Sequence, residues 1–262
     1  MTTVWLDGRF LPERKALVPA TDPAFLYGHG VFEVLRAYGG VPFRLKDHLA
    51  RMKHSAQIFG VPFLLPDLRP VVRSLSRKNR APDAYVRVTL SASGHLLVIV
   101  RPRTSLPRAW YRKGTEVMIA PWRRDPRAPL AGHKTLNYLE NVRTHQEALR
   151  RGCADALYVG PRGQLLEGCV TNVFLVLGGR LITPRLGAGI LPGVTRKVVM
   201  ELERVRERTV RLKELWKAEE AFLTNALIEV LPLGKPGPVT RRVADAYRRL
   251  TRAPNPGPEA RS

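Results

Sequence analysis

Apolar residues recur at helical spacing in the first quarter of the chain, before a glycine at position 60. The stripe consists of Leu45, Leu49, Met52, Ala56 and Phe59. A glycine directly after such a stripe is a common end signal, so the pattern predicts one helix. Arg51 lies beside the stripe on a neighbouring face. We therefore expect its guanidinium to lie outside the core, where it can reach a ligand.

Hairpins and helices are both predicted in the first half of the chain. Apolar runs flank glycine-containing turns at residues 7–8 and 39–40, which is typical of β-hairpins. A second helix is expected around residues 67–78, before strands at 84–91 and 96–101. This mixture predicts an α+β layer.

The second half reads as short strands separated by glycine-rich turns at 161–163 and 178–179, with helices between them. The expected elements are a helix at 137–151, a helix opened by Thr195, a buried strand at 221–224 and a last helix at 241–250. The fold class predicted for the whole chain is therefore α+β with two lobes.

A proline- and arginine-rich stretch separates the two halves. Residues 121–132 hold three prolines and three arginines, which is typical of a linker. We expect a smaller α+β domain at 1–120 and a larger α/β domain at 133–252. Residues 253–262 contain three prolines and are expected to form a mobile tail.

Composition is that of a globular enzyme. The chain has 262 residues, of which 44% are hydrophobic, and no apolar run reaches membrane-spanning length. The first ten residues alternate like a strand instead of resembling a signal peptide, so a cytoplasmic protein without membrane contact is expected. Cys153 and Cys169 have no CxxC spacing and no histidine cluster, which predicts free thiols and no metal site.

The formal net charge of +22 raises the alternative of a noncatalytic basic binding protein. The arginines are, however, spread along the chain in short clusters, without aromatic residues interleaved among them and without a zinc or recognition-helix signature. We expect a solvated basic surface and no nucleic-acid partner. A positive cleft would also attract a small anionic substrate.

Lys134 is the most informative residue, because lysine is scarce in a chain with 34 Arg and 10 Lys. It follows a Pro/Gly/Arg-rich loop and directly precedes a helical pattern in HKTLNYLENV. An arginine cannot lose its proton, whereas a lysine amine can do so and attack a carbonyl. This choice indicates a Schiff base with pyridoxal phosphate, although an isolated lysine is more often a solvated one.

Two downstream motifs complete a cofactor constellation. Glu167 ends a short apolar strand and could keep a pyridine nitrogen protonated. Val194 and Thr195 open a helix after Pro192-Gly193, where free N–H groups, a hydroxyl and the helix dipole suit a phosphate.

Six motifs, spread over nearly the whole chain, resemble the fold type IV, or class IV, pyridoxal-phosphate enzymes. They are DPAFLYGHGVFEVLR, PFRLKDHLARM, HKTLNYLENV, LLEGCVTNVF, GILPGVTR and AFLTNALIEVLP. This group includes branched-chain aminotransferases, D-amino-acid aminotransferases and 4-amino-4-deoxychorismate lyases. The resemblance implies its two-lobed fold, a small-molecule substrate and a homodimer with both sites near the subunit interface.

The resemblance also implies roles for individual residues. Lys134 would form the Schiff base, Glu167 would pair with the pyridine nitrogen, and Tyr138 would bond the phenolic oxygen of the cofactor. Tyr138 stands one residue closer to the lysine than in the branched-chain enzymes. The phosphate contacts implied are Arg51, Val194, Thr195 and, after Asn225, the backbone N–H of Ala226.

The reaction is expected to be that of the lyase, with a branched-chain or D-amino-acid aminotransferase as the alternative. The turn at residues 225–227 resembles the lyases, and Ala92 stands where a D-amino-acid enzyme would carry an arginine. His29 replaces the aspartate of the aminotransferase Gly-Asp-Gly run. Val34, however, replaces a threonine that assists proton transfer in some lyases.

In the lyase mechanism Lys134 would remove the C4 proton of aminodeoxychorismate, and loss of pyruvate would leave 4-aminobenzoate, the folate precursor. Arg36 and Arg87 are candidate carboxylate ligands because a guanidinium matches a carboxylate. Each could instead be a structural ion-pair residue. His29 is a further candidate substrate contact, and its alternative is an exposed turn histidine.

Overall fold

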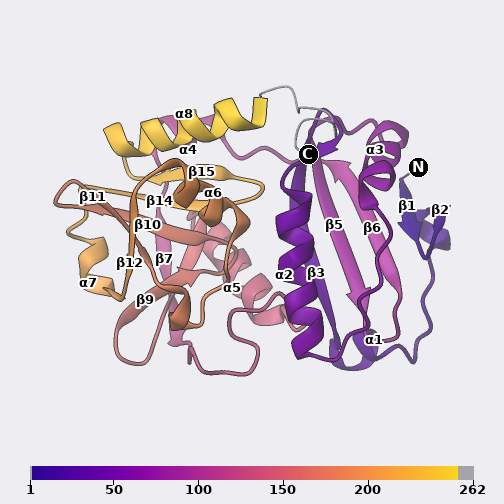
Figure 1. Cartoon of the computed structure of the whole chain (residues 1–262). Helices are drawn as coiled ribbons and strands as arrows, with labels where there is room; N and C mark the ends of the chain where they lie inside the picture. The colour runs from indigo at the N-terminus through magenta and orange to yellow at the C-terminus, as the bar shows by residue number, and fades with distance from the viewer. Residues whose placement is uncertain (1, 253–262) are drawn as a thin grey trace, which may run out of the picture.

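One antiparallel sheet of six strands organises the first half of the chain, in a computed structural model that describes residues 2–252 (Figure 1). The strand order is β2-β1-β6-β5-β3-β4. The strands are β1 (Thr3–Leu6), β2 (Arg9–Pro12), β3 (Gly30–Tyr38), β4 (Val41–Pro42), β5 (Ala84–Ser91) and β6 (Leu96–Pro102). Both predicted hairpins are confirmed, since β1 pairs with β2 and β3 with β4.

Helices α2 (Leu45–Ile58) and α3 (Leu68–Lys78) pack on this sheet. Met52 and Ala56 of the predicted stripe are buried against Leu35 and Val86 of the strands. The periodicity therefore identified the buried face correctly, because a helix with one apolar stripe is stable only when another layer covers it. A short helix α1 (Pro23–Tyr27) precedes β3, and the 3₁₀ turn η1 (Glu13–Lys15) follows β2.

Two further sheets stack in the second half. A five-stranded sheet has the order β12-β11-β10-β14-β15, and a four-stranded sheet has the order β13-β9-β8-β7. Their strands are β7 (Val117–Arg123), β8 (Asp155–Val159), β9 (Gln164–Gly168), β10 (Asn172–Leu177), β11 (Arg180–Pro184), β12 (Val205–Arg208), β13 (Val210–Arg211), β14 (Glu220–Asn225) and β15 (Glu229–Leu233). Leu157 and Leu165 of one sheet pack against Leu175 and Leu223 of the other.

Helices cover the outer faces of this pair of sheets. On the five-stranded sheet, Val198 of α6 and Tyr247 of α8 pack with Phe174 and Phe222, whose rings stack at 5.0 Å. On the other sheet, Ala148 of α5 packs near Tyr158. The helices of this half are α4 (Arg108–Lys113), α5 (Leu139–Arg150), α6 (Val194–Leu202), α7 (Leu212–Leu215) and α8 (Pro238–Arg252), with the 3₁₀ turn η2 (Leu186–Ala188).

The chain passes between the halves earlier than the sequence predicted. β7 starts at Val117, inside the domain expected for residues 1–120, yet it pairs in parallel with β8 of the second half. The same strand includes residues 121–123 of the expected linker. The division into domains stays a prediction, but its boundary at residue 120 does not coincide with the change of sheet.

Three smaller points complete the description. The tail expected at 253–262 lies outside the described residues. Within residues 2–252, no helix is both long and apolar enough to cross a membrane, and no cluster of His, Cys, Asp or Glu is arranged to hold a metal ion. Cys153 and Cys169 are free and buried.

Candidate active site

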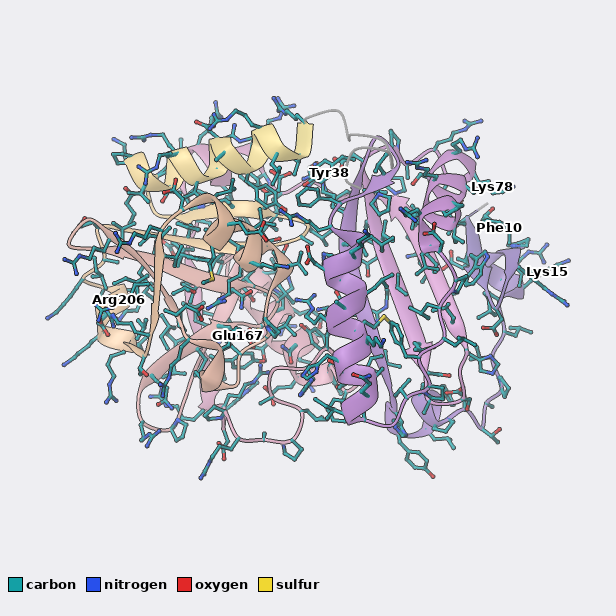
Figure 2. All side chains as sticks on the ribbon, viewed as in Figure 1. Phe10, Lys15, Tyr38, Lys78, Glu167 and Arg206 are labelled. Atoms are coloured by element: carbon teal, nitrogen blue, oxygen red, sulfur yellow. The ribbon has the colours of Figure 1, made fainter. Side chains whose placement is uncertain are left out.

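A cavity of about 770 Å³ lies where the two halves meet. The first half contributes β3 and α2 to its wall, and the second half contributes the end of β9, the start of α6 and the turn after β14. Figure 2 places Glu167 in the middle of the molecule, away from outer residues such as Lys15 and Arg206. The predicted cofactor residues Lys134, Glu167, Arg51, Tyr138, Val194, Thr195, Asn225 and Ala226 all line this one cavity.

The Lys134 segment is attached to a strand and does not open a helix. The Phe32 N–H donates to the Lys134 carbonyl at 3.0 Å, and the Leu136 N–H donates to the Gly30 carbonyl at 3.0 Å. These bonds hold the segment extended beside β3, so α5 begins only at Leu139 instead of at the expected residue 137. The helix expected at 137–151 is present as α5, and the lysine before it lies on a segment that is hydrogen-bonded to the first sheet.

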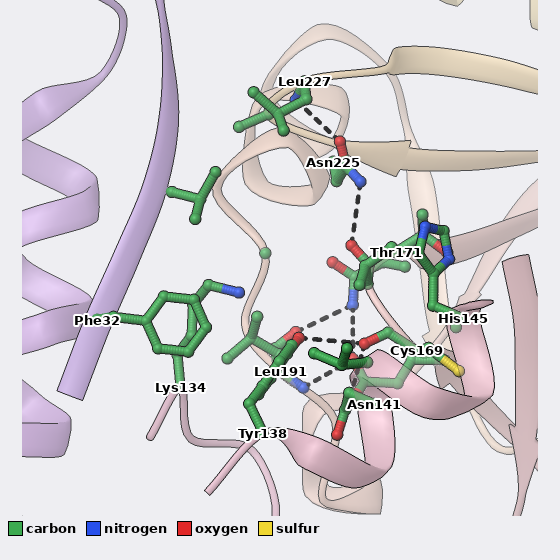
Figure 3. Close-up of a pocket in the computed structure, with 18 of the residues that line it drawn as sticks. Phe32, Lys134, Tyr138, Asn141, His145, Cys169, Thr171, Leu191, Asn225 and Leu227 are labelled. Atoms are coloured by element: carbon green, nitrogen blue, oxygen red, sulfur yellow. Dashed lines mark hydrogen bonds between the residues drawn. The ribbon is translucent and has the colours of Figure 1, made fainter. Parts of the chain in front are cut away.

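The Lys134 amine faces the cavity beside two aromatic rings (Figure 3). Nζ lies 4.5 Å from the centroid of Phe32 and 4.9 Å from that of Tyr138. No hydrogen bond or ion pair joins it to another residue among those that the structure describes. Burial lowers the pKa of Lys134 to about 8, although the carboxylates of Glu33 and Glu167 oppose the shift. The amine therefore loses its proton near neutral pH more readily than an ordinary lysine.

Glu167 is held at the end of β9 by donors from the second half. Its Oε2 accepts from the Leu191 N–H at 3.0 Å and from Asn172 Nδ2 at 3.3 Å. Burial raises the pKa of Glu167 to about 8, against the nearby charge of Arg124. Gly193 lies against the same Asn172, and a Cβ at this position would overlap the Asn172 side-chain oxygen. The close approach of these segments therefore requires glycine.

The start of α6 and the Arg51 guanidinium form a site suited to an anion. Arg51 donates Nη1 to the Pro192 carbonyl at 2.9 Å, which places its charge directly before the helix. No side chain caps α6, and first-turn N–H groups such as those of Val194 and Thr195 have no partner within a helix. Ala226 and Thr224 line the same cavity, and the buried Thr224 Oγ1 has no hydrogen-bond partner within residues 2–252.

These features fit pyridoxal phosphate. Its phosphate suits the Arg51 and α6 region, its aldehyde carbon suits an unpaired buried amine, and its ring nitrogen suits a buried carboxylate. Tyr138 lines the same cavity, its ring centroid lies 5.1 Å from that of Phe32 in an edge-to-face arrangement, and its hydroxyl donates to the Cys169 carbonyl at 3.1 Å.

Two predicted substrate residues lie elsewhere. Arg36 donates to both carboxylate oxygens of Asp83 and to Glu229 Oε1, so its guanidinium is occupied by structural ion pairs outside the cavity lining. His29 is exposed, pairs its Nε2 with the Phe59 carbonyl at 2.8 Å and does not line the cavity. The structure of this chain therefore does not bring Arg36 or His29 to the cavity with the other predicted site residues.

Arg87, in contrast, reaches the cavity wall. Its guanidinium carbon lies 3.9 Å from the centroid of Phe32, and Nε donates to Thr89 Oγ1 at 3.1 Å. Among the described residues it forms no ion pair with a carboxylate. Arg87 keeps its place as a candidate carboxylate ligand.

Two important residues were missed. Glu33 is fully buried and binds Arg51 through two hydrogen bonds, of 2.7 and 2.6 Å, while also pairing with His48 Nδ1 at 2.8 Å. Burial alone would raise the pKa of Glu33, but Arg51 and His48 hold it at about 2. The signal was present in the sequence, as a carboxylate in an apolar strand. Arg124, which the sequence showed only as part of a basic pair, lies 3.9 Å from Glu167.

The fold and site together define a pyridoxal-phosphate enzyme with two lobes and a cofactor lysine between them. The sequence profile described as "Amino-transferase class IV" matches residues 30–235, and the chain belongs to this family. Members of this family use pyridoxal phosphate, so the predicted cofactor and the predicted fold type are confirmed.

Relatives with known names agree. The chain is 33% identical over 248 residues to a putative branched-chain-amino-acid aminotransferase of Methanocaldococcus jannaschii, covering 88% of this chain and 86% of that one. It is similar to the crystal structure of a branched-chain aminotransferase of Thermoproteus uzoniensis with norvaline, with a TM-score of 0.85, 30% identity and coverage of 95% and 94%. The holo branched-chain aminotransferase of Thermobaculum terrenum gives a TM-score of 0.82 at 28% identity, covering 95% and 94%. These names support the expected alternative, an aminotransferase, and give no support to the expected lyase.

Proposed function

We propose that the protein is a pyridoxal-phosphate-dependent aminotransferase that accepts amino acids with aliphatic side chains. The observation that carries this proposal is the Lys134 amine, which has no hydrogen-bond acceptor among the described residues and lines the same cavity as the anion site. The branched-chain aminotransferases among its relatives support the reaction type.

In this proposal the cofactor is held at three points. Arg51, the N–H groups of Val194 and Thr195 and the Ala226 N–H bind the phosphate. Glu167 pairs with the ring nitrogen, and the Tyr138 hydroxyl donates to the phenolic oxygen in place of the Cys169 carbonyl. When bound, the cofactor supplies an electron sink for the carbanion that forms when an amino acid loses its Cα proton.

Lys134 then holds and moves protons at the substrate Cα. Its lowered pKa of about 8 suits a general base, because a base works best when its pKa lies near the operating pH. The Phe32 ring beside Nζ restricts water around the amine.

Substrate recognition is assigned to the first-half wall of the cavity. Val34, Tyr85 and Leu106 present mainly apolar surface there, which suits an aliphatic side chain. Arg87 on the same wall supplies a charge for a substrate carboxylate.

The lyase activity on aminodeoxychorismate is the second candidate, and one feature of the site favours it. Asn225 Oδ1 accepts from the N–H groups of Leu227 and Ile228, at 2.8 and 2.9 Å, and Nδ2 donates to the Val170 carbonyl. These two cavity-lining amides are thus not free to bind the α-carboxylate of an amino acid, a group that aminodeoxychorismate does not carry on its amine-bearing carbon. This is the same turn whose sequence resembles the lyases.

A homodimer remains our prediction for the assembly. Exposed aromatic residues of α1, Phe25 and Tyr27, stand on a helix whose following glycine carbonyl accepts from Asn137 Nδ2, near exposed Leu139. An apolar surface of this kind, beside the Lys134 segment, is consistent with a subunit interface near the site. Sedimentation equilibrium would contradict the prediction by finding only a monomer.

One experiment separates the two reactions. The purified, cofactor-loaded protein is mixed with L-leucine, L-valine or D-alanine without a 2-oxo acid, and separately with aminodeoxychorismate. We expect the branched-chain amino acids to convert the cofactor to its amine form with stoichiometric release of the 2-oxo acid. Repeated release of pyruvate and 4-aminobenzoate, with no such conversion by amino acids, would replace the aminotransferase proposal by the lyase.

A further inference from the structure

Arg124 is not among the residues proposed to contact the cofactor or the substrate. It lies, however, beside Glu167, the carboxylate proposed to pair with the ring nitrogen of the cofactor. Its Nη1 lies 3.9 Å from Glu167 Oε1, and both residues line the cavity. The separation exceeds a hydrogen bond, so the guanidinium acts on Glu167 through its charge.

The position of Arg124 is fixed on three sides. Its guanidinium carbon stacks 3.4 Å from the ring centroid of Tyr158, and Nη2 donates to Glu140 Oε1 at 2.8 Å and Asn141 Oδ1 at 3.0 Å. Asn141 Nδ2 in turn donates to the carbonyl of Cys169, two residues after Glu167. The strand that supports Arg124 and the helix that supports its partners therefore share one network around the carboxylate.

The surroundings of Glu167 indicate what the charge of Arg124 does. Glu167 accepts hydrogen bonds from two neutral donors, the Leu191 N–H and Asn172 Nδ2. Burial favours the protonated carboxyl, and Arg124 is the largest influence in the opposite direction. A carboxylate that shares a proton with a pyridine nitrogen leaves that proton on the nitrogen only while its own ionised form is stabilised.

We propose that Arg124 is a positioning residue that favours the ionised form of Glu167 against the effect of burial and so directs the shared proton to the ring nitrogen of the cofactor. The role rests on the proposed function for its consequence in catalysis, but not for its effect on Glu167. An opposite charge within about 4–6 Å changes a carboxyl pKa by roughly 1–3 units, which is about a ten- to thousandfold change in the proton equilibrium.

The first test uses the apoenzyme and needs no cofactor. The protein is labelled with ¹³C at glutamate carboxyls, and Glu167→Gln identifies the Glu167 signal. We expect Arg124→Met to move the midpoint of the Glu167 titration upward by at least one pH unit, and Arg124→Lys to restore most of the shift. Arg123→Met, the exposed neighbour, is the matched control and should leave the midpoint unchanged. An unchanged midpoint in Arg124→Met overturns the proposal.

The second test reads the proton on the cofactor. Holoenzyme carrying ¹⁵N-labelled pyridoxal phosphate should give a protonated ring-nitrogen signal in the native protein and in Arg124→Lys, and a shift toward the unprotonated position in Arg124→Met. A protonated signal in all three proteins also overturns the proposal. Failure to bind the cofactor in the native protein would instead contradict the proposed function, and the apoenzyme titration would still decide the role of Arg124. Circular dichroism and thermal unfolding establish that Arg124→Met is folded.

Discussion

Two cations that line the cavity, Arg51 and Lys134, differ in what surrounds them. Arg51 donates three hydrogen bonds, two to Glu33 and one to the Pro192 carbonyl. Lys134 makes none with its side chain among the described residues and faces aromatic rings. A paired guanidinium cannot change its charge and stays where it is held, whereas an amine without a partner can lose its proton and react. Arg51 is therefore suited to hold a bound group in place, and Lys134 is suited to react.

The largest expected effect comes from removing the Lys134 amine. Lys134→Ala should lose the visible Schiff base, the borohydride-fixed cofactor at this position and at least about 10²–10⁴-fold of the activity, which is the usual contribution of a general base. Peptide mapping after borohydride treatment checks the attachment. A reducible Schiff base on another lysine of the variant would show that Lys134 is not the cofactor residue.

Replacing Glu33, the carboxylate partner of Arg51, should mainly lower the free energy of unfolding. Glu33→Gln leaves the buried Arg51 without its carboxylate, and breaking a buried ion pair on one side costs about 3–5 kcal/mol. Urea unfolding of the apoenzyme measures the loss. Glu13→Gln, which breaks the exposed pair with Arg101, is the control and should cost no more than about 1 kcal/mol. Equal losses in the two variants would mean that the Glu33 pair is not a structural clamp.

The lowered pKa of Lys134 predicts a pH profile for cofactor attachment. Only the unprotonated amine attacks the aldehyde, so the attachment rate of the apoenzyme should rise with pH around a midpoint of about 8, against 10.5 for an ordinary lysine. At pH 7 this lower pKa raises the fraction of unprotonated amine on the order of 10²-fold over that of an ordinary lysine. Stopped-flow absorbance from pH 6 to 10 measures the profile. A midpoint near 10 would indicate that burial does not depress the pKa.

The smallest expected effect concerns the phosphate end beside Arg51. Thr195→Val removes one hydroxyl while the backbone N–H groups stay, and a hydrogen bond to a charged group is worth about 1.5–3 kcal/mol. Cofactor affinity should fall roughly tenfold or more, as measured by equilibrium titration of the apoenzyme. Thr209→Val, at an exposed position, serves as the control. Unchanged affinity in Thr195→Val would remove this hydroxyl from the proposed phosphate site.

Local patterns were enough to predict much of the molecule. The stripe in α2 and the turns at 7–8 and 39–40 depend on neighbours in sequence, so their elements follow from spacing and turn residues. Lys134 and Glu167 were found because their chemistry is unusual for their surroundings, and the family motifs reinforced both. The sequence by itself therefore determined the class of enzyme, the cofactor and most of the residues placed around the cavity.

Tertiary structure decided which charged residues are free. Arg36 lies on β3 opposite Tyr85, and Arg87 lies on the adjacent strand β5 opposite Val34. Nothing in the local sequence of the two arginines distinguishes them. Arg36 is occupied by Glu229, 193 residues away along the chain, while Arg87 is left facing the cavity. The pairing of β7 with β8 and the approach of Arg124 to Glu167 were equally hidden. Ion pairs and parallel strands join segments distant in sequence, so only the folded chain decides which groups meet and which remain available for chemistry.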